Sequence, residues 1–176
     1  YESNMFKHET QVIKFLLQWY SMNARKLPWR KKNNLNLSHP YFVFVSEYML
    51  QQTTVNTVKN KFNEFILKWP SLNKLAQTSE PNILEFWSGL GYYSRARNLL
   101  KSAKIIKNNF KNKIPETYDE LIQLPGIGDY TAKAILGIGY NKSVMPLDAN
   151  IERILVRLHA IDKPINKVKN KLKDLG

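Results

Sequence analysis

The sequence predicts an all-α fold, and three observations support this prediction. Apolar residues recur at the spacing of an amphipathic helix in several segments, and no segment shows the strict alternation of a β-strand. Thr117 and Glu120 form the capping-box pattern that begins a helix. The chain has 176 residues and is 43% hydrophobic, which suits one domain, or one domain with a small appendage, around a proper core.

The expected elements follow in chain order. The first helix covers residues 9–22 and ends before Pro28, after which a polar loop runs to Pro40. Residues 41–50 are so apolar that periodicity cannot separate a helix from a strand, but the polar residues that follow and the helical surroundings favour a helix. The remaining expected helices are residues 55–69, 71–77, 81–87, 94–110 and a short one after Thr117.

Composition restricts the possible partners. The net charge of +13 and the pI of about 9.8 point to a polyanion, and nucleic acid is the first candidate. Lys and Asn are abundant along the whole chain, so the charge by itself is weak support. No apolar run approaches about 20 residues and no signal-peptide pattern is visible, so we expect no membrane partner and a cytoplasmic location. The chain has no Cys, which excludes disulfides and Cys-ligated metals.

The segment 124–150 carries the strongest local pattern. Pro125, Gly126 and Gly128 cannot continue a helix, so the chain must turn there before a new helical pattern begins. Backbone N–H groups at the start of the second helix favour an anion such as a phosphate. Without other information, a plain connection between two helices is the commoner meaning of this Gly-x-Gly pattern.

Two carboxyl groups are candidates for chemistry. Asp148 precedes a new apolar helical pattern, where an Asp is more often only an N-cap, but it would also lie beside a nucleic-acid backbone held by the turn. Glu47 lies among apolar residues of the 41–50 segment. If its side chain is buried, desolvation should raise its pKa, whereas an exposed stripe on the helix is at least as common.

Three segments resemble a known family. They are LPGIGDYTAKAI followed by PLDANIERIL, SEYMLQQT at 46–53, and WSGLGYYSRARNL at 87–99. In this order they resemble the endonuclease III superfamily of helix-hairpin-helix DNA glycosylases, and the adenine glycosylases of the MutY branch in particular. The resemblance runs from about Leu27 to the end of the chain. The chain begins without Met and stops within a Lys-rich helical pattern, so we expect a C-terminally truncated fragment of this fold.

The resemblance implies a base-excision repair enzyme that removes adenine mispaired with 8-oxoguanine or guanine. Glu47 would protonate the adenine and later activate water, and Asp148 would stabilise the sugar cation electrostatically or capture it covalently. Tyr130 and Asn150 would support Asp148. Two alternatives stay open: an endonuclease III-like pyrimidine glycosylase, and a non-catalytic helix-hairpin-helix DNA-binding module.

Position 130 indicates the reaction subtype. Bifunctional members of the superfamily carry a Schiff-base lysine two residues after the second glycine of the hairpin, where this chain has Tyr130. A tyrosine cannot form an imine, so a monofunctional hydrolase is expected. Lys133 lies nearly a full helical turn further on and is better placed for a phosphate.

The resemblance also implies a set of DNA contacts. Tyr92 and Gln52 would intercalate into the duplex when the target base is extruded, with Leu90 beside them. Arg95, near the start of the next helix, would contact a phosphate or extend its stem along apolar surface. The residues predicted to contact DNA are Trp29, Arg30, Gln52, Leu90, Tyr92, Arg95, Gly126, Gly128, Thr131 and Lys133.

The family pattern completes the expected organisation. Residues 1–26 would form an N-terminal helix, and 27–160 a helical core with the hairpin at about 118–140. Residues 161–176 would begin an incomplete C-terminal part. The family usually carries a 4Fe-4S cluster, whose Cys-rich loop would lie beyond Gly176, so this chain is expected to bind no cofactor. The expected partner is double-stranded DNA with a mispaired adenine, bound by a monomer at the bacterial nucleoid.

Overall fold

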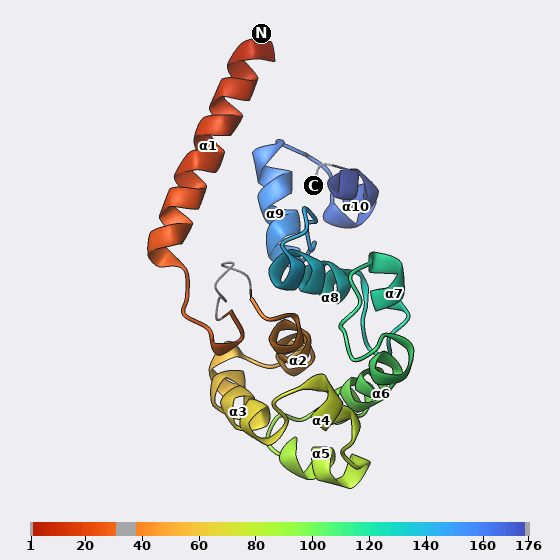
Figure 1. Cartoon of the computed structure of the whole chain (residues 1–176). Helices are drawn as coiled ribbons and strands as arrows, with labels where there is room; N and C mark the ends of the chain where they lie inside the picture. Colours follow the sequence, from red (N-terminus) through yellow and green to blue (C-terminus); the bar gives the residue numbers. More distant parts are fainter. Residues whose placement is uncertain (1, 31–37, 175–176) are drawn as a thin grey trace.

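The computed structural model describes residues 2–30 and 38–174, and the side chains of residues 10–30 and 38–172 (Figure 1). The elements are α1 (Glu2–Asn23), η1 (Pro28–Arg30), α2 (Pro40–Leu50), α3 (Val55–Lys68), α4 (Leu72–Ala76), α5 (Glu80–Phe86), α6 (Ser94–Asn109), α7 (Tyr118–Ile122), α8 (Asp129–Ala134), η2 (Ile135–Gly139), α9 (Ala149–Leu158) and α10 (Ile165–Asp174). These described residues form helices and no β-strand, so the all-α prediction is confirmed. Most of the expected polar loop, residues 31–37, lies outside the described residues.

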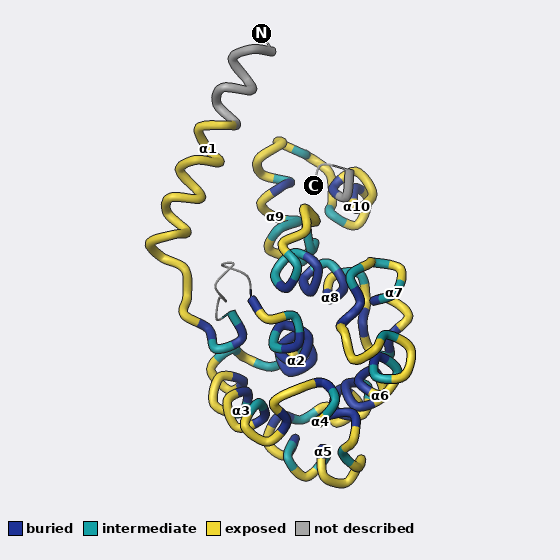
Figure 2. The backbone as a smooth tube through the Cα atoms, viewed as in Figure 1, coloured by how far each residue is buried: buried dark blue, intermediate teal, exposed yellow. Residues whose placement is uncertain are grey.

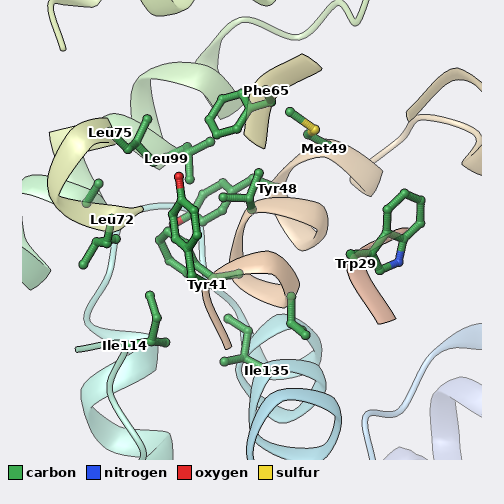
Figure 3. Packing of buried hydrophobic residues seen from close by; sticks show 14 of the residues in the cluster. Trp29, Tyr41, Tyr48, Met49, Phe65, Leu72, Leu75, Leu99, Ile114 and Ile135 are labelled. Carbon is green, nitrogen blue, oxygen red and sulfur yellow. The ribbon is translucent and has the colours of Figure 1, made fainter. Parts of the chain in front are cut away.

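Helix α2 lies at the centre of the main core. It packs against α3, α6 and η2, and nearly all of its residues are buried (Figures 2 and 3). A helix that is apolar on all sides is stable only when other elements surround it, which explains why this segment lacked a clear helical stripe. The helix begins with Pro40 at its first position, and the His39 side chain accepts a hydrogen bond from the N–H of Tyr41. The expectation of a helix at 41–50 is therefore confirmed.

Hydroxyl side chains begin four of the helices. Thr54, Ser71, Ser79 and Thr117 each accept a hydrogen bond from a backbone N–H in the first turn of α3, α4, α5 and α7. Of the capping box predicted at Thr117, the bond from the Glu120 N–H to the Thr117 hydroxyl is present at 3.4 Å, and that hydroxyl donates to the Glu120 carboxylate at 2.6 Å. These local signals explain why the predicted starts of these four helices agree closely with the observed ones, whereas α1 begins at Glu2 and not at residue 9 as predicted.

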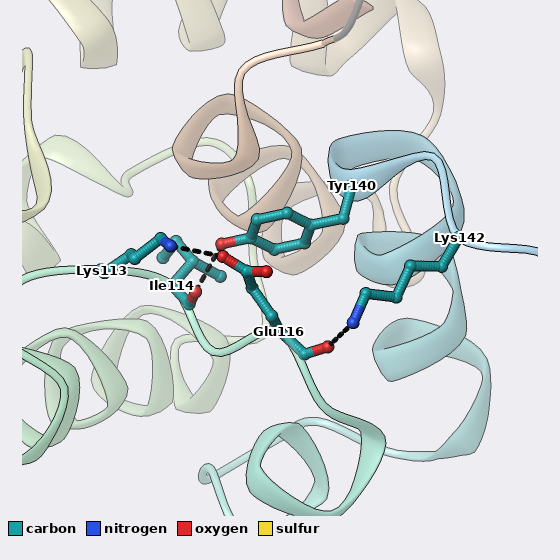
Figure 4. A network of polar contacts seen from close by, with 5 residues as sticks. All are labelled: Lys113, Ile114, Glu116, Tyr140 and Lys142. Atoms are coloured by element: carbon teal, nitrogen blue, oxygen red, sulfur yellow. Dashed lines mark hydrogen bonds and ion pairs between the residues drawn. The ribbon is translucent and has the colours of Figure 1, made fainter.

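Helix α8 continues into a π-helical turn, η2, which the sequence did not predict. Gly139 brings this turn against α2, because a Cβ there would lie 3.2 Å from the Cα of Pro40. Behind the turn, the Tyr140 hydroxyl donates to the carbonyl of Ile114 and the Lys142 ammonium to the carbonyl of Glu116 (Figure 4). These bonds join the end of η2 to the segment that precedes α7, so both ends of the hairpin region are held together.

Helices α9 and α10 pack on each other around a second, smaller cluster made by Leu155, Val168 and Leu172. The predicted boundary at residue 160 falls inside this cluster, and the domain ranges stay a prediction. Helix α1 extends away from the other helices, and its apolar residues from Val12 to Met22 are about half or more exposed (Figures 1 and 2). No described helix is long and apolar enough to cross a membrane.

Candidate active site

Glu47 is a buried carboxyl group in the main core. It lies on α2 between Ser46 and Tyr48 and is only 8% exposed. Burial raises the pKa of Glu47 to about 7, although the positive charge of Arg30 opposes this rise. The sequence left open whether Glu47 was buried or on an exposed stripe, and the structure decides for burial. Such a group can hold and deliver a proton near neutral pH.

Arg30 supplies positive charge next to this carboxyl group. It ends η1, and its Nη1 donates to the Tyr20 hydroxyl at 3.2 Å. Its Nε atom is buried and has no hydrogen-bond partner among the described residues. The guanidinium opposes the rise in pKa of both Glu47 and Tyr130, so it acts electrostatically on two of the predicted catalytic residues.

Asp148 is the N-cap of α9, as the simpler interpretation of the sequence predicted. Its Oδ1 accepts hydrogen bonds from the backbone N–H groups of Asn150 at 2.9 Å and Ile151 at 2.8 Å. Its Oδ2 lies 3.5 Å from the side-chain amide of Asn150, which in turn accepts a bond from Arg153 at 2.9 Å. The side chain of Asp148 is partly exposed, which leaves room for a further role.

Tyr130 links the two carboxyl groups. It lies in the first turn of α8 and is 42% exposed. Burial raises its pKa, and the negative charges of Glu47 and Asp148 both add to this effect. Glu47 on α2 and Asp148 at the start of α9 therefore both influence the hydroxyl group of Tyr130 electrostatically. The arrangement combines a buried acid of raised pKa with a second, partly exposed carboxyl group, which suits the cleavage of a glycosidic bond.

The predicted hairpin turn is present between α7 and α8. The N–H of Ile127 donates to the carbonyl of Leu124 at 3.1 Å, with Pro125 and Gly126 as the two central residues. Gly126 has a φ of +80°, as the third position of a type II turn requires. A Cβ at Gly126 would lie 2.8 Å from the Asn98 side chain and 3.2 Å from the ring of Tyr48, so this glycine is also needed for close packing.

Side chains of α2 and α6 hold this turn in place. The Tyr48 hydroxyl donates to the carbonyl of Pro125 at 2.6 Å, and the Ser102 hydroxyl donates to the same oxygen at 3.2 Å. The Gln51 amide donates to the carbonyl of Gly126 at 3.1 Å. The sequence analysis missed these residues, because hydrogen bonds between positions 23 to 77 apart leave no local pattern.

The start of α8 is open beside Gly128. A Cβ added there would meet no atom within 4 Å, so an incoming backbone could approach closely. The Lys133 ammonium lies on the same helix, 3.4 Å from the carboxylate of Asp129. Thr131, by contrast, is buried, and its contact with DNA stays a prediction.

Gln52 and Tyr92, the predicted intercalating residues, share two properties. Both are exposed, Tyr92 to 61%, and both have positive φ values, of 55° and 46°. A residue other than glycine adopts this backbone conformation only when its surroundings hold it there. Their presentation to solvent agrees with the prediction, while the intercalating role itself stays a prediction.

Three further residues predicted to contact DNA have side chains that face the core, and their contact with DNA stays a prediction. Trp29 is 2% exposed and packs edge-on against the ring of Phe62. Leu90 is 5% exposed, as is Arg95. The side chain of Arg95 points inward from the start of α6, and its guanidinium group donates to backbone carbonyls. Nothing in the local sequence distinguishes this arginine from an exposed one.

The chain offers no fit for the family's iron–sulfur cluster. Such a cluster is held by Cys thiolates, and the sequence contains no Cys. Among the described residues, no group of three or more His, Asp or Glu side chains could hold a metal ion.

The chain belongs to the HhH-GPD superfamily of base excision DNA repair proteins, whose family model matches residues 45–176. It is 47% identical over 148 residues to an adenine DNA glycosylase of Buchnera aphidicola, covering 84% of this chain and 41% of that protein. The human adenine DNA glycosylase is 40% identical, over 90% of this chain and 30% of its own length. The chain therefore spans less than half of these relatives.

The fold is similar to that of solved glycosylase structures. A thermostable thymine-DNA glycosylase aligns with a TM-score of 0.75 at 24% identity, covering 86% of this chain and 68% of that one. Endonuclease III in a non-covalent DNA complex aligns with a TM-score of 0.71 at 19% identity, covering 94% and 76%. These likenesses establish the helix-hairpin-helix glycosylase fold.

Proposed function

We propose that this protein is a monofunctional DNA glycosylase that hydrolyses the N-glycosidic bond of adenine mispaired with 8-oxoguanine or guanine. The adenine DNA glycosylases that match at 40–47% identity support the substrate. The structure supports the chemistry, and one observation carries it. Glu47, a buried carboxyl group with a pKa of about 7, and Asp148, whose carboxyl group caps α9, both influence the hydroxyl group of Tyr130 electrostatically.

In the first step, Glu47 donates its proton to a ring nitrogen of the extruded adenine. The bond between that base and C1′ of the sugar breaks, and its electron pair leaves with the protonated adenine. Glu47 must be protonated for this step, which its burial favours near neutral pH.

In the second step, the carboxylate of Asp148 stabilises the oxocarbenium-like sugar. Negative charge close to a developing cation is a large contribution to such reactions. Glu47, now ionised, accepts a proton from a water molecule that adds to C1′, which regenerates the acid and completes the hydrolysis. Tyr130 and Asn150 support the orientation of Asp148, since Asn150 bonds to both of its oxygens.

The hydrolytic subtype follows from position 130. A lyase needs an amine that attacks C1′, and Tyr130 has a hydroxyl group with a raised pKa. The nearest amine on the same helix, Lys133, forms an ion pair with Asp129. Water is thus the nucleophile that completes the reaction.

The remaining DNA contacts follow from exposure. Gln52 and Tyr92 enter the duplex, while the turn at Gly126 and Gly128 and the ammonium of Lys133 contact the phosphate backbone. The enzyme acts as a monomer on double-stranded DNA, at the bacterial nucleoid in the cytoplasm. The net charge of +13 supports binding to DNA.

A single-turnover assay tests the proposal against its rivals. The full-length protein is incubated with duplexes that carry adenine opposite 8-oxoguanine, or a thymine glycol opposite adenine. Release of adenine without strand cleavage supports the proposal. Excision of thymine glycol would favour an endonuclease III-like enzyme, and tight binding without excision of either base would favour a non-catalytic DNA-binding module.

A further inference from the structure

The buried arginine at the start of α6 connects two loops that are far apart in the sequence. The Gln52 loop comprises residues 51–54, directly after α2, and the Tyr92 loop comprises residues 88–93, directly before α6. Arg95 donates from Nη1 to the carbonyl of Gln51 in the first loop, and from Nη2 and Nε to carbonyls of the second loop. One planar group thus bonds to both loops.

The hydrogen bonds of Arg95 use its whole guanidinium group. Nη1 donates to the carbonyl oxygens of Tyr48 at 3.2 Å, Met49 at 2.7 Å and Gln51; Nη2 donates to those of Leu90 at 2.8 Å and Gly91 at 3.0 Å; and Nε donates to that of Tyr92 at 3.4 Å. An arginine has five N–H donors, so six acceptors saturate it. A lysine has three donors on a single atom and could not reach both loops in the same way.

The position of Arg95 has a cost that these bonds offset. A positive charge in the first turn of α6 is unfavourable, because the N-terminal end of a helix is itself partly positive. The same charge lies at the C-terminal end of α2, where it binds the carbonyls of Tyr48 and Met49, and there it is favourable. Burial of a guanidinium is tolerated here because backbone oxygens surround it.

The two loops present Gln52 and Tyr92 in strained backbone conformations. Both have positive φ values, and the carbonyls that Arg95 binds belong to Tyr92 itself and to Gln51, the neighbour of Gln52. The guanidinium carbon also lies 5.6 Å from the centroid of the Tyr92 ring, over which it is placed. The bonds of Arg95 are therefore adjacent to the two exposed side chains whose orientation matters.

We infer that Arg95 is a positioning residue that joins the Gln52 loop and the Tyr92 loop into one rigid wedge on the C-terminal end of α2. The inference rests on the proposed function, because a wedge is needed only by an enzyme that extrudes a base from the duplex. Since Glu47 lies on the same helix, four residues before Gln51, the wedge and the general acid share one rigid support. Arg95 thereby fixes where the duplex opens relative to Glu47.

The test measures duplex opening separately from excision. Arg95→Met and Arg95→Lys are made in the full-length protein that also carries Glu47→Gln, so that the duplex stays intact. The probe is a duplex with 2-aminopurine next to an adenine opposite 8-oxoguanine, whose fluorescence rises when stacking is lost. The same two substitutions without Glu47→Gln are assayed for single-turnover excision at saturating protein.

We expect the Arg95→Met protein to lose most of the fluorescence rise and about a hundredfold in excision rate, as a displacement of about 1 Å at a reacting site does. Arg95→Lys should also lose most of the rise, although it keeps the charge. Arg97→Gln is the matched control, because Arg97 is exposed, pairs with Glu80 at 2.9 Å and bonds to neither loop. That substitution should change both readouts less than twofold.

A second control separates positioning from stability. Ile106 is fully buried at the far end of α6, so Ile106→Ala lowers the melting temperature without touching the loops. The comparison is made where Ile106→Ala and Arg95→Met lower the melting temperature by the same amount. There the Ile106→Ala protein should keep the parental fluorescence rise and the parental excision rate per folded molecule. Equal losses of the fluorescence rise and of the excision rate in both proteins would overturn the inference. A folded Arg95→Met protein with the parental fluorescence rise and excision rate would also overturn it.

The two proposals fail in different ways. A parent protein that unstacks the probe but excises no adenine would overturn the proposed function, while the fluorescence of the Arg95 variants would still decide the positioning role. A parent protein that binds the duplex without any fluorescence rise would overturn both.

Discussion

Glu47 and Asp148 are the same functional group in two opposite environments. Glu47 lies inside α2, at the centre of the main core, and is 8% exposed. Asp148 lies at the start of α9, near the smaller cluster, and is partly exposed. Burial removes water from Glu47, whereas Asp148 accepts hydrogen bonds from two backbone N–H groups.

The comparison shows how the fold can give two acids different roles. Burial disfavours the charged form of Glu47 and raises its pKa to about 7, so the proton is retained until neutral pH. The carboxyl group of Asp148 instead accepts hydrogen bonds from two backbone N–H groups at the start of α9. Neither effect needs an unusual residue. The buried helix α2 supplies the first, and the backbone N–H groups at the start of α9 supply the second. The predictions below alter one side of this contrast at a time.

The largest effect is expected from Glu47→Gln, which keeps the shape but cannot deliver a proton. Excision should fall by about two to four orders of magnitude while folding survives. In the parent protein, excision should decline as the pH rises through about 7, since Glu47 then loses its proton. Single-turnover rates between pH 5 and 9 measure both effects.

The control for this substitution is Glu85→Gln, which alters an exposed acid on α5. That variant should keep the parental rate and pH profile. A Glu47→Gln protein that melts normally and still excises adenine would rule out the acid role of Glu47.

The next largest effect is expected from Asp148→Asn. Asparagine is as good an N-cap as aspartate, so α9 should form normally, but the negative charge beside the sugar is lost. Excision should fall by about two to three orders of magnitude with duplex affinity retained. Asp162→Asn, at an exposed position, serves as the control. Near-parental excision by Asp148→Asn would leave Asp148 as an N-cap only.

The sequence predicted what depends on local pattern. Starts of helices could be located because a hydroxyl side chain such as Thr117 caps the next turn, whatever the rest of the chain does. The burial of Glu47 was one of two stated outcomes, and its apolar neighbours favoured a raised pKa. Both inferences use residues within a few positions of each other.

The sequence could not predict what depends on distant contacts. Arg95 was expected to contact a phosphate or to extend its stem along apolar surface. Its burial depends on carbonyls 44 to 47 residues away in the sequence, which a local pattern does not reveal. The π-helical turn at Ile135–Gly139 was missed for a similar reason. Its Gly139 packs against Pro40, about a hundred residues earlier, and the hydrophobic periodicity of the sequence does not reveal so distant a contact.

A gain of function is expected from Tyr130→Lys, which places an amine between the two acids. An amine that reaches C1′ of the abasic sugar can form an imine, so some strand cleavage should appear, at a fraction of the rate of base release. Borohydride trapping on a duplex measures the covalent adduct, with Tyr118→Lys as the control because Tyr118 bonds to Asp129 instead. No trapped adduct with Tyr130→Lys would contradict the placement of residue 130 beside the sugar.

The smallest effect concerns stability and isolates burial from catalysis. Below about pH 4.5 Glu47 is neutral in both the folded and the unfolded chain, and above about pH 7 it is ionised in both. Between these values the unfolded chain loses the proton first, so the free energy of unfolding should fall as the pH rises. The full difference is on the order of 3 kcal/mol, at about 1.4 kcal/mol for each unit of pKa.

Glu47→Gln removes this dependence, because the amide does not titrate. The free energy of unfolding of the Gln variant minus that of the parent should therefore increase between pH 4.5 and 7 and then level off. Urea unfolding followed by circular dichroism at pH 5 and pH 8 measures the change, with Glu85→Gln as the exposed control. If the difference in the free energy of unfolding were the same at both pH values, Glu47 would be solvated in the folded protein. The contrast between Glu47 and Asp148 would then have a cause other than burial.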